Sequence, residues 1–331
     1  MAQPSGKAKC QHPGRHHWPV STPATMNEQY GEGPAALSRL YQKAKAAQWN
    51  VETEFDWTYE FDPENPLNLH DGTLLLFGTS VWDSLGETVR VRVRQHTQAW
   101  TVSQILHGEQ AALVCASRLA QAETTIPAKL CAAAQVIDEA RHVEAYSRLV
   151  SKLITQYPMS PALTGLVRDT ISSRELDITN LGMQILIEGL ALAIFHLIIA
   201  YTRDPFVKSL VSRIQVDEAR HFAAGRLTLE PLYAEMTESE RRAREEFVCC
   251  GVIALNEHLC ADAIWEPTGL PFDRCHAVVR ESPMARTLRR SLFRRLVPLI
   301  RDMSLLTRKV REVFDQMGVL EYEHLPNQVM V

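Results

Sequence analysis

The pentapeptide Asp-Glu-Ala-Arg-His occurs twice in this chain, at residues 138–142 and 217–221, with an offset of 79 residues. Two further glutamates keep this offset, because Glu109 lies 30 residues before Glu139 and Glu188 lies 30 residues before Glu218. An internal repeat of this kind indicates a duplicated structural unit. The repeat contains six side chains that can bind metal: Glu109, Glu139, His142, Glu188, Glu218 and His221.

The spacing of the repeat predicts how these side chains meet. The midpoint of each glutamate pair falls in a turn-like sequence, AETTIP in the first unit and TRDP in the second. Two helices that run antiparallel across each turn would bring both glutamates of a pair to the same height. Within each motif the glutamate and the histidine, three residues apart, lie about 60° apart on one helical face. We therefore expect two half-sites that face each other, each formed by a Glu and a Glu-x-x-His.

The rest of the chain predicts an all-α fold. Residues 1–33 are rich in Pro, Gly, Ser and Thr without a period, which is typical of a flexible N-terminal leader. A first helix is expected from Pro34, followed by an irregular, acidic and aromatic segment. From there the hydrophobic periodicity predicts a bundle of long helices over 88–121, 127–156, 162–172, 174–202, 205–234, 238–264 and 283–316.

The donor set predicts the kind of metal. Four carboxylates and two imidazoles suit a pair of ions of the iron or manganese type, because structural zinc favours thiolates and calcium sites lack imidazole. Glu188 stands inside the apolar run LGMQILIEGLALAIFHLII, where an unpaired carboxylate would carry a large desolvation cost. We expect two iron ions (Fe²⁺/Fe³⁺), with a Mn/Fe pair as the alternative.

Composition excludes several other classes of protein. The chain has 35 Lys and Arg against 39 Asp and Glu, and this net charge of −4 is too small to predict nucleic acid or a membrane surface as the main partner. The apolar run around 190–200 contains His196 and falls short of a membrane span. Seven cysteines without a C-x-x-C spacing, together with an N-terminus that lacks an apolar signal region, indicate a reduced, cytoplasmic protein.

Both motifs resemble the D-E-x-R-H signature of the ferritin-like di-iron carboxylate superfamily, and most of all its oxygen-activating branch. That branch includes the hydroxylase subunits of multicomponent monooxygenases, acyl-carrier-protein desaturases and ribonucleotide reductase small subunits. The resemblance implies a ferritin-like four-helix core at about 88–235 within a domain of 34–331, with accessory helices over 238–316.

The resemblance also implies roles for individual residues. Glu109 and Glu188 would be terminal ligands, Glu139 and Glu218 would bridge the ions, and His142 and His221 would each bind one ion. Metal-bound imidazoles are usually oriented by an acceptor on their other nitrogen. The resemblance implies that these acceptors are crossed, Asp138 with His221 and Asp217 with His142. Arg141 and Arg220 would balance the buried charge, or else form ordinary ion pairs on the helix surface.

The chain departs from its relatives at two positions. The monooxygenases carry a threonine one turn after the third-helix glutamate, where this chain has Leu192. Arylamine N-oxygenases of the superfamily carry an additional histidine one turn before the last glutamate, where this chain has Ile214. We therefore expect the chain to lie outside that subgroup, although N-oxygenation as a reaction stays open.

Three other features suggest roles around the site. Tyr146 occupies the position of the radical tyrosine in many reductase small subunits, although packing is the simpler interpretation. Apolar residues one turn from the glutamates are candidate pocket walls, or simply core: Ile105, Ala112, Leu113, Ile185, Ala191, Leu192 and Phe195. The arginine-rich sequence over 286–311 could dock an acidic ferredoxin or carrier protein, or could pair within the chain with the acidic segment 54–64.

These observations predict an O2-dependent di-iron oxygenase that hydroxylates or N-oxygenates a small organic substrate. The electrons must come from an external ferredoxin or reductase, because neither a dinucleotide-binding fingerprint nor a cysteine cluster is present. The alternatives are a desaturase, a radical-generating oxidase and a ferroxidase. The sequence leaves open a carrier-bound substrate and a homodimer.

Overall fold

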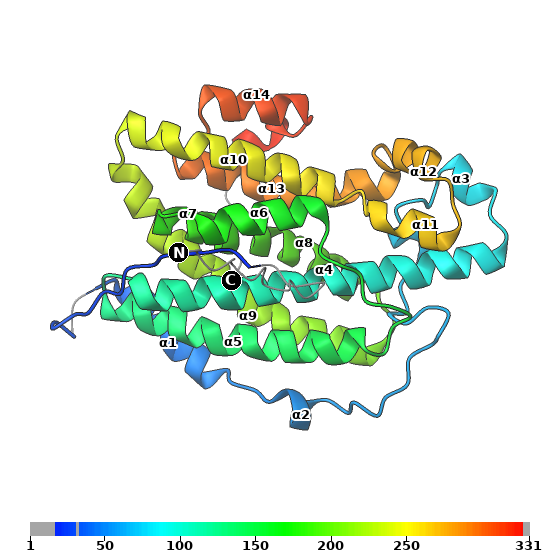
Figure 1. Ribbon diagram of the computed structural model, residues 1–331, viewed down its shortest axis with the longest axis horizontal. Helices are drawn as coiled ribbons and strands as arrows, with labels where there is room; N and C mark the ends of the chain where they lie inside the picture. Colours follow the sequence, from blue (N-terminus) through cyan, green and yellow to red (C-terminus); the bar gives the residue numbers. More distant parts are fainter. Residues whose placement is uncertain (1–16, 31–32, 327–331) are drawn as a thin grey trace, which may run out of the picture.

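The computed structural model of the chain describes residues 17–30 and 33–326, and its elements are helices (Figure 1). No strand occurs within these ranges, where Leu69 and Thr202 form an isolated antiparallel bridge. The prediction of an all-α fold is therefore confirmed.

Four long helical segments form the core of the molecule. Helix α4 (Glu87–Ala122) packs along α5 (Ile126–Val150), and α8 (Glu188–Tyr201) packs along α9 (Pro205–Glu235). The two turns between these paired helices are the ones expected from the repeat. At the first, Oγ1 of Thr125 accepts from the backbone N–H of Ala128, and at the second, Oδ1 of Asp204 accepts from Val207 at 2.9 Å. Such caps, followed by a proline in the first turn, explain why helices start there.

The third segment of the core is not a regular α-helix. Helix α7 (Leu176–Asn180) continues into a π-helical segment, Leu181–Ile187, which ends where α8 begins at Glu188. The backbone N–H of Glu188 accordingly bonds to the carbonyl of Met183, five residues earlier. The sequence predicted one α-helix over this range. π-Helical turns are rare and often occur at functional sites, and this one directly precedes a metal-ligand candidate.

The remaining helices cover two sides of this core (Figure 1). On one side lie α6 (Pro161–Ser172), α10 (Glu238–His258), α13 (Pro283–Asp302) and α14 (Arg308–Gln316). On the other lie α1 (Ala35–Ala46) and α2 (Val51–Glu54), and α1 contacts both α5 and α9. Short helices α3 (Ser80–Asp83), α11 (Trp265–Thr268) and α12 (Phe272–Val279) gather near the N-terminal end of α4.

Three helices end earlier than predicted. Helix α5 stops at Val150 rather than 156, and α10 stops at His258 and is followed by Ala261 with a φ of +50°. The predicted helix 283–316 is two helices, because Ser304 adopts a φ of +58°. The backbone N–H of Leu305 then bonds to Ile300 and that of Ser304 to Arg301, a Schellman motif that buries Leu305. Glycine usually takes this left-handed position, so the serine gave no signal in the sequence.

Among the described residues, two helical segments are long and apolar enough to cross a membrane by composition. They are Leu176–Tyr201, whose most apolar window has a mean hydropathy of 2.1, and Glu238–Thr268, which extends from α10 through α11 and whose window has 1.5. The most apolar window of each is mostly buried inside the protein, 67% and 56% respectively, as in core helices of soluble proteins. From the sequence, we judged the apolar run around 190–200 too short to span a membrane, whereas the longer segment Leu176–Tyr201 is long and apolar enough. Burial by neighbouring helices explains why it is so apolar.

The predicted leader lies partly outside the described residues. Within the described part, the backbone N–H of Thr25 bonds to the carbonyl of Gln121, and its hydroxyl bonds to that of Ala122. The side chain of Arg118 donates to Oγ1 of Thr22. This stretch therefore runs against the end of α4.

Candidate metal centre

The six residues of the repeat come together in the middle of the four-helix core. Glu109 comes from α4, Glu139 and His142 from α5, Glu188 from the start of α8, and Glu218 and His221 from α9. All six are buried, with at most 4% of any residue exposed. Their donor atoms form two groups in which every atom lies within 4.8 Å of the others. One group contains Glu109 and His142, the other contains Glu188 and His221, and both contain Glu139 and Glu218.

Each histidine presents Nδ1 to the carboxylates. Nδ1 of His142 lies 3.2 Å from Oε2 of Glu109 and 3.0 Å from Oε1 of Glu218. Nδ1 of His221 lies 3.0 Å from Oε1 of Glu139 and 3.5 Å from Oε1 of Glu218. In each group, the imidazole nitrogen and the carboxylate oxygens therefore face one another closely enough to bind one ion between the helices.

Several of these atoms lack a hydrogen bond although they are buried. Oε2 of Glu188, Oε1 of Glu218 and Nδ1 of His221 have no partner with hydrogen-bond geometry. Buried polar atoms are otherwise almost always paired, because an unpaired one costs about 1–3 kcal/mol. Buried oxygen and nitrogen atoms that converge without hydrogen-bond partners fit cations, and the mixed carboxylate and imidazole set fits ions of the iron or manganese type.

The electrostatics of the cluster show the same need for positive charge. Burial, reinforced by the charge of Glu218, raises the pKa of both Glu109 and Glu188 well above the ordinary value. Burial acts to lower the pKa of His142 and His221, but the neighbouring glutamates and aspartates outweigh it and raise both. The protein alone therefore holds protons where bound cations would balance the charge.

The outer nitrogens of the histidines face aspartates from the opposite motif. Nε2 of His142 lies 3.3 Å from Oδ2 of Asp217, and Nε2 of His221 lies 3.2 Å from Oδ2 of Asp138. The pairs are thus crossed between α5 and α9. An aspartate on Nε2 holds the proton there and leaves Nδ1 with a lone pair for a metal.

The two arginines of the motifs lie over these aspartates. Arg141 donates to Asp138 on its own helix and lies 3.8 Å from Asp217. Arg220 donates to Asp217 and also reaches Asp138 at 3.2 Å. Their side chains are each only 11% exposed, so they form a buried network rather than ion pairs on the surface.

Three residues that sequence reasoning did not place at the centre bond to its residues. Gln48 and Trp49, in the connection after α1, bond to Asp138 and Asp217 at 3.3 and 2.7 Å. Nε2 of Gln135 donates to Glu188 at 2.8 Å and to Glu139 at 3.1 Å, and its oxygen accepts from Gln184. Gln135 stands one turn before Glu139, a spacing that could have found it. Nothing in the sequence links residues 48 and 49 to the repeat.

Tyr146 is buried one turn after His142. Its hydroxyl has no hydrogen-bond partner, and its ring stacks on Phe195 with the centroids 6.2 Å apart. Burial and the charge of Glu109 raise the pKa of its hydroxyl well above the ordinary value. The residue therefore packs as a neutral aromatic side chain within the core.

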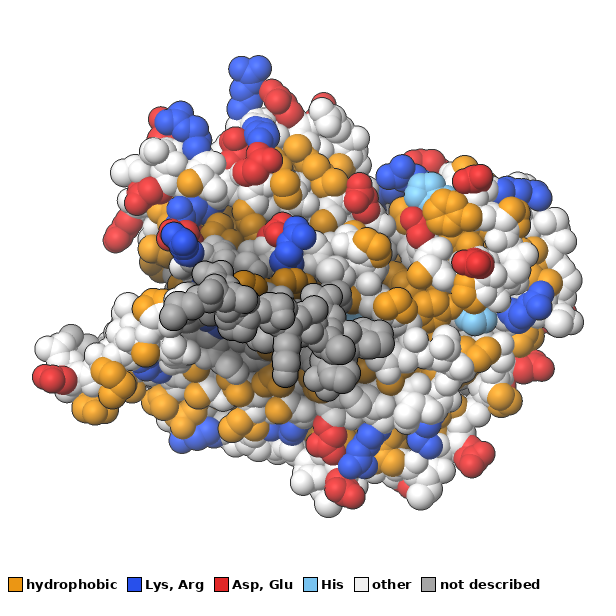
Figure 2. Space-filling model, viewed as in Figure 1, with side chains coloured by type: hydrophobic (Ala, Val, Ile, Leu, Met, Phe, Trp, Pro, Cys, Tyr) orange, Lys and Arg blue, Asp and Glu red, His pale blue; other side chains and the backbone are white. Residues whose placement is uncertain are grey.

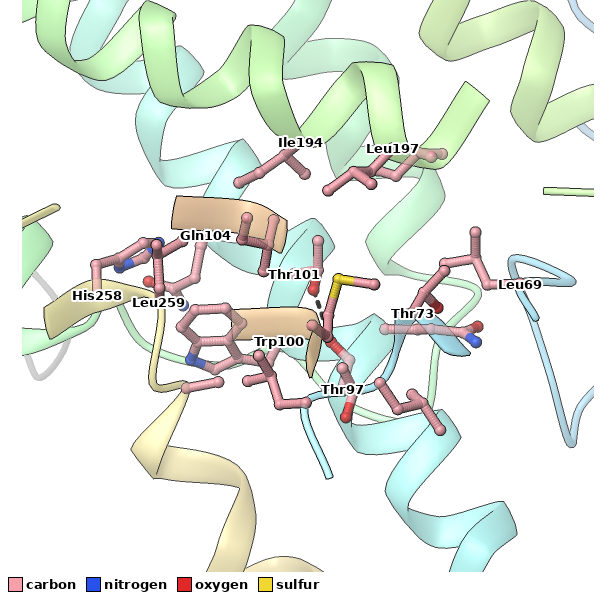
Figure 3. A pocket seen from close by; sticks show the side chains of 17 residues that line it. Leu69, Thr73, Thr97, Trp100, Thr101, Gln104, Ile194, Leu197, His258 and Leu259 are labelled. Atoms are coloured by element: carbon pink, nitrogen blue, oxygen red, sulfur yellow. Dashed lines mark hydrogen bonds between the residues drawn. The ribbon is translucent and has the colours of Figure 1, made fainter. Parts of the chain in front are cut away.

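A cavity lies between α4 and α8 (Figure 3), and none of the six metal-ligand candidates lines it. It has about 790 Å³ of empty volume, part of it open to solvent, and a mostly apolar lining. Thr101 and Gln104 line it from α4, and Ile194 and Leu197 line it from α8. With a rise of 1.5 Å per residue, Gln104 lies about 7.5 Å along α4 from Glu109, and Ile194 about 9 Å along α8 from Glu188.

The expected pocket walls lie elsewhere. Most are buried in the apolar core, and none lines this cavity: Ile105, Ala112, Leu113, Ile185, Ala191, Leu192 and Phe195. Residues one turn from the glutamates fill the space between helices, whereas the cavity opens two turns away. His196 is exposed, so its side chain does not approach the centre.

The arginine-rich sequence near the C-terminus is split between α13 and α14. On α14, Lys309 pairs with Glu246, Arg308 with Glu312 and Arg311 with Glu323. Figure 2 shows charges of both signs at this end of the molecule. The pairing within the chain therefore uses α10 and the segment after α14, and not the acidic segment 54–64.

One family of known proteins matches most of the chain. The family described as p-aminobenzoate N-oxygenase AurF matches residues 32–304. No curated protein matches the chain. Among solved structures, an R2-like ligand-binding oxidase variant with an anaerobically reconstituted Mn/Fe cofactor has 14% identity and a TM-score of 0.49, over 81% of this chain and 99% of that one. A photoconverted R2-like ligand-binding oxidase with an aerobically reconstituted metal cofactor has 14% identity and a TM-score of 0.44, over 77% and 93%.

The family match corrects one expectation. Ile214 had placed the chain outside the arylamine N-oxygenases, and its side chain is indeed buried among apolar residues. A match over most of the chain outweighs one missing ligand position, since the other six donors of the repeat are in place. The chain belongs to the p-aminobenzoate N-oxygenase AurF family and is an oxidoreductase, a di-iron oxygenase of the ferritin-like superfamily.

Proposed function

We propose that this protein inserts one oxygen atom of O2 into the N–H bond of a small arylamine, at a centre of two iron ions. The observation that carries the proposal is the pair of donor groups that share Glu139 and Glu218. Glu109 and His142 would hold one ion, Glu188 and His221 would hold the other, and the two shared glutamates would bridge them.

The chemistry divides between the metal and the protein. Bound iron supplies the redox chemistry that activates O2, as metal cofactors generally do. Asp138 and Asp217 keep the Nδ1 atoms of the histidines free of protons, and Gln135 orients the carboxylate of Glu188. The apolar surroundings exclude water. The balanced reaction takes an amine R–NH2, O2, two electrons and two protons to R–NHOH and water.

The cavity between α4 and α8 is the proposed substrate site. It lies close to the glutamates along both helices, and its apolar lining suits an aromatic ring.

The two electrons require a donor, for which α13 offers a surface. Arg286, Arg290 and Arg294 are exposed and follow one another at intervals of four residues, so they lie along one helical face. Arg290 and Arg294 have no carboxylate within ion-pair distance among the described residues. We propose that this stripe docks an acidic ferredoxin or reductase in the cytoplasm, where the six free cysteines of the described chain would stay reduced.

Metal analysis tests the centre. We expect about two irons per chain after anaerobic loading, a coupled pair in the Mössbauer spectrum, and loss of about one iron in Glu188→Gln. Incubation with an arylamine, O2 and a reductant should give the hydroxylamine in the wild type alone. One iron or none in the wild type, unchanged by the substitution, would contradict the proposal.

Charge reversal on α13 tests the docking surface separately. The double charge reversal Arg290→Glu/Arg294→Glu should raise the KM for an acidic donor, whereas turnover with a small chemical reductant should not change. The matched control reverses Arg308, which is exposed on α14 and already pairs with Glu312. Equal effects of both reversals would argue against docking at α13.

A further inference from the structure

The cavity between α4 and α8 has a lining without charge. Its side chains are apolar apart from three threonines, two glutamines and one histidine. Neither a lysine nor an arginine is among them. The family, in contrast, is described as a p-aminobenzoate N-oxygenase, and the carboxyl group of p-aminobenzoate is an anion at neutral pH.

The two glutamines of the lining are already engaged by the protein. Gln98 accepts from the backbone N–H of Leu67 at 2.8 Å and donates to Asn65 at 2.6 Å. Gln104 donates to the carbonyl of Pro158 at 2.9 Å and accepts from the N–H of Ser160 at 2.8 Å. Both amides therefore hold loops in place and cannot turn toward an anion without breaking those bonds.

The histidine of the lining is not a cation either. Nδ1 of His258 pairs with Oγ of Ser160 at 2.8 Å, and its ring packs against Trp100 with centroids 5.0 Å apart. Burial lowers the pKa of His258 to about 4, so the ring is neutral at physiological pH. Trp100 and His258 together form an uncharged aromatic wall, visible on one side of the cavity in Figure 3.

Two arginines line a separate recess that shares Leu69 with the cavity. There the guanidinium of Arg94 makes a two-point contact with Asp71, at 2.6 and 2.7 Å, and also pairs with Glu87. Arg203 lines that recess and not the cavity. A carboxylate held against the lining of the cavity would consequently meet no counter-charge.

We propose that the substrate is an uncharged, mostly apolar arylamine, and that the cavity excludes p-aminobenzoate. The proposal rests on the function proposed above and assigns its substrate class. The physical reason is the desolvation of an anion that meets no cation, which outweighs the favourable burial of its ring. A neutral group in place of the carboxylate keeps the favourable burial of the aromatic ring and removes the cost of desolvating an anion.

Ligand binding without turnover provides the test. Protein loaded with Mn²⁺ in the absence of O2 would be titrated in a calorimeter with p-aminobenzoate and with its neutral analogues, p-aminobenzamide and methyl p-aminobenzoate. We expect the neutral compounds to bind at least about 100-fold more tightly than the acid. Equal or tighter binding of the acid would overturn the proposal, and so would the binding of none of the three.

Two variants locate the binding site. Leu197→Trp should fill the cavity and abolish binding of the neutral compounds, whereas His196→Ala, its exposed neighbour, should leave binding unchanged. Thr101→Lys, which adds a cation to the lining, should raise the affinity for the acid relative to the amide, and an unchanged preference would count against the proposal. Ligand affinity is measured separately from metal content. If protein that holds two ions prefers the acid, the proposal of an uncharged substrate is refuted, but the proposed metal centre is not.

Discussion

Nε1 of Trp49 donates a 2.7 Å hydrogen bond to Oδ2 of Asp217, a residue 168 positions later in the chain. The same Oδ2 atom lies 3.3 Å from Nε2 of His142, and the indole ring stacks on that imidazole at an angle of 27° with centroids 6.4 Å apart. The connection after α1 therefore helps to orient a residue of the metal centre. This contact anchors the first helix to the bundle through the site itself.

Trp49→Phe should weaken metal binding by about 10-fold to 100-fold, because Asp217 would lose a donor and hold His142 less firmly. The measurement is a competitive titration of iron or manganese against a chelator of known affinity. Trp57→Phe is the matched control, since Nε1 of Trp57 donates to the carbonyl of Val51 away from the site. An equal loss in both variants would point to general destabilisation instead.

Glu188→Gln should have opposite effects on the metal-free and the loaded protein. Without metal, it replaces an acid whose pKa is raised by burial with a neutral amide, and it should stabilise the fold by about 1–3 kcal/mol because no charge or proton has to be accommodated there. With metal, it removes a ligand and should cancel much of the stabilisation that loading provides. Thermal unfolding with and without iron checks both signs. Glu235→Gln, an exposed residue at the end of α9, should change neither.

Gly225→Ala should destabilise the protein by about 1–3 kcal/mol. A Cβ at this position would stand 2.7 Å from Cβ of Gln184 and 3.1 Å from Oδ1 of Asn180, on the segment that leads into Glu188. The control is Gly108→Ala on α4, where a Cβ meets nothing within 4 Å. That change should stabilise the helix by about 0.5–1 kcal/mol. Chemical denaturation distinguishes them, and two changes of the same sign would contradict the packing described.

Protonation of His258 should destabilise the protein in mild acid. Its pKa is about 4 in the fold and about 6.5 in the unfolded chain, so the unfolded state binds more protons between these values. Stability is therefore lost as pH falls from about 6.5 toward 4, by up to about 3 kcal/mol. His258→Phe should flatten this part of the curve relative to wild type, while His196→Gln, at an exposed site, should follow wild type. Parallel curves for His258→Phe and wild type would refute the assignment.

The sequence determined the helical class and the set of metal-ligand candidates. A period of 79 residues that includes Glu109, Glu188 and both pentapeptides is local information, since helical geometry alone places such residues on matching faces. The two turns were readable for the same reason, because proline and a capping side chain mark helix starts. The family match is consistent with these metal-ligand candidates, although Ile214, in place of the additional histidine, had led us to expect a chain outside the arylamine N-oxygenases.

Only the tertiary structure decided what surrounds those ligands. Trp49 reaches Asp217 because α1 packs across α5 and α9, a contact between distant segments that no local pattern encodes. The cavity lies more than one turn from the glutamates because side chains one turn away, such as Ile105 and Leu192, fill the space between helices. Its uncharged character likewise depends on which loops engage Gln98 and Gln104. Periodicity defines the face of a helix, but the identity of the neighbour against that face is a property of the packed molecule.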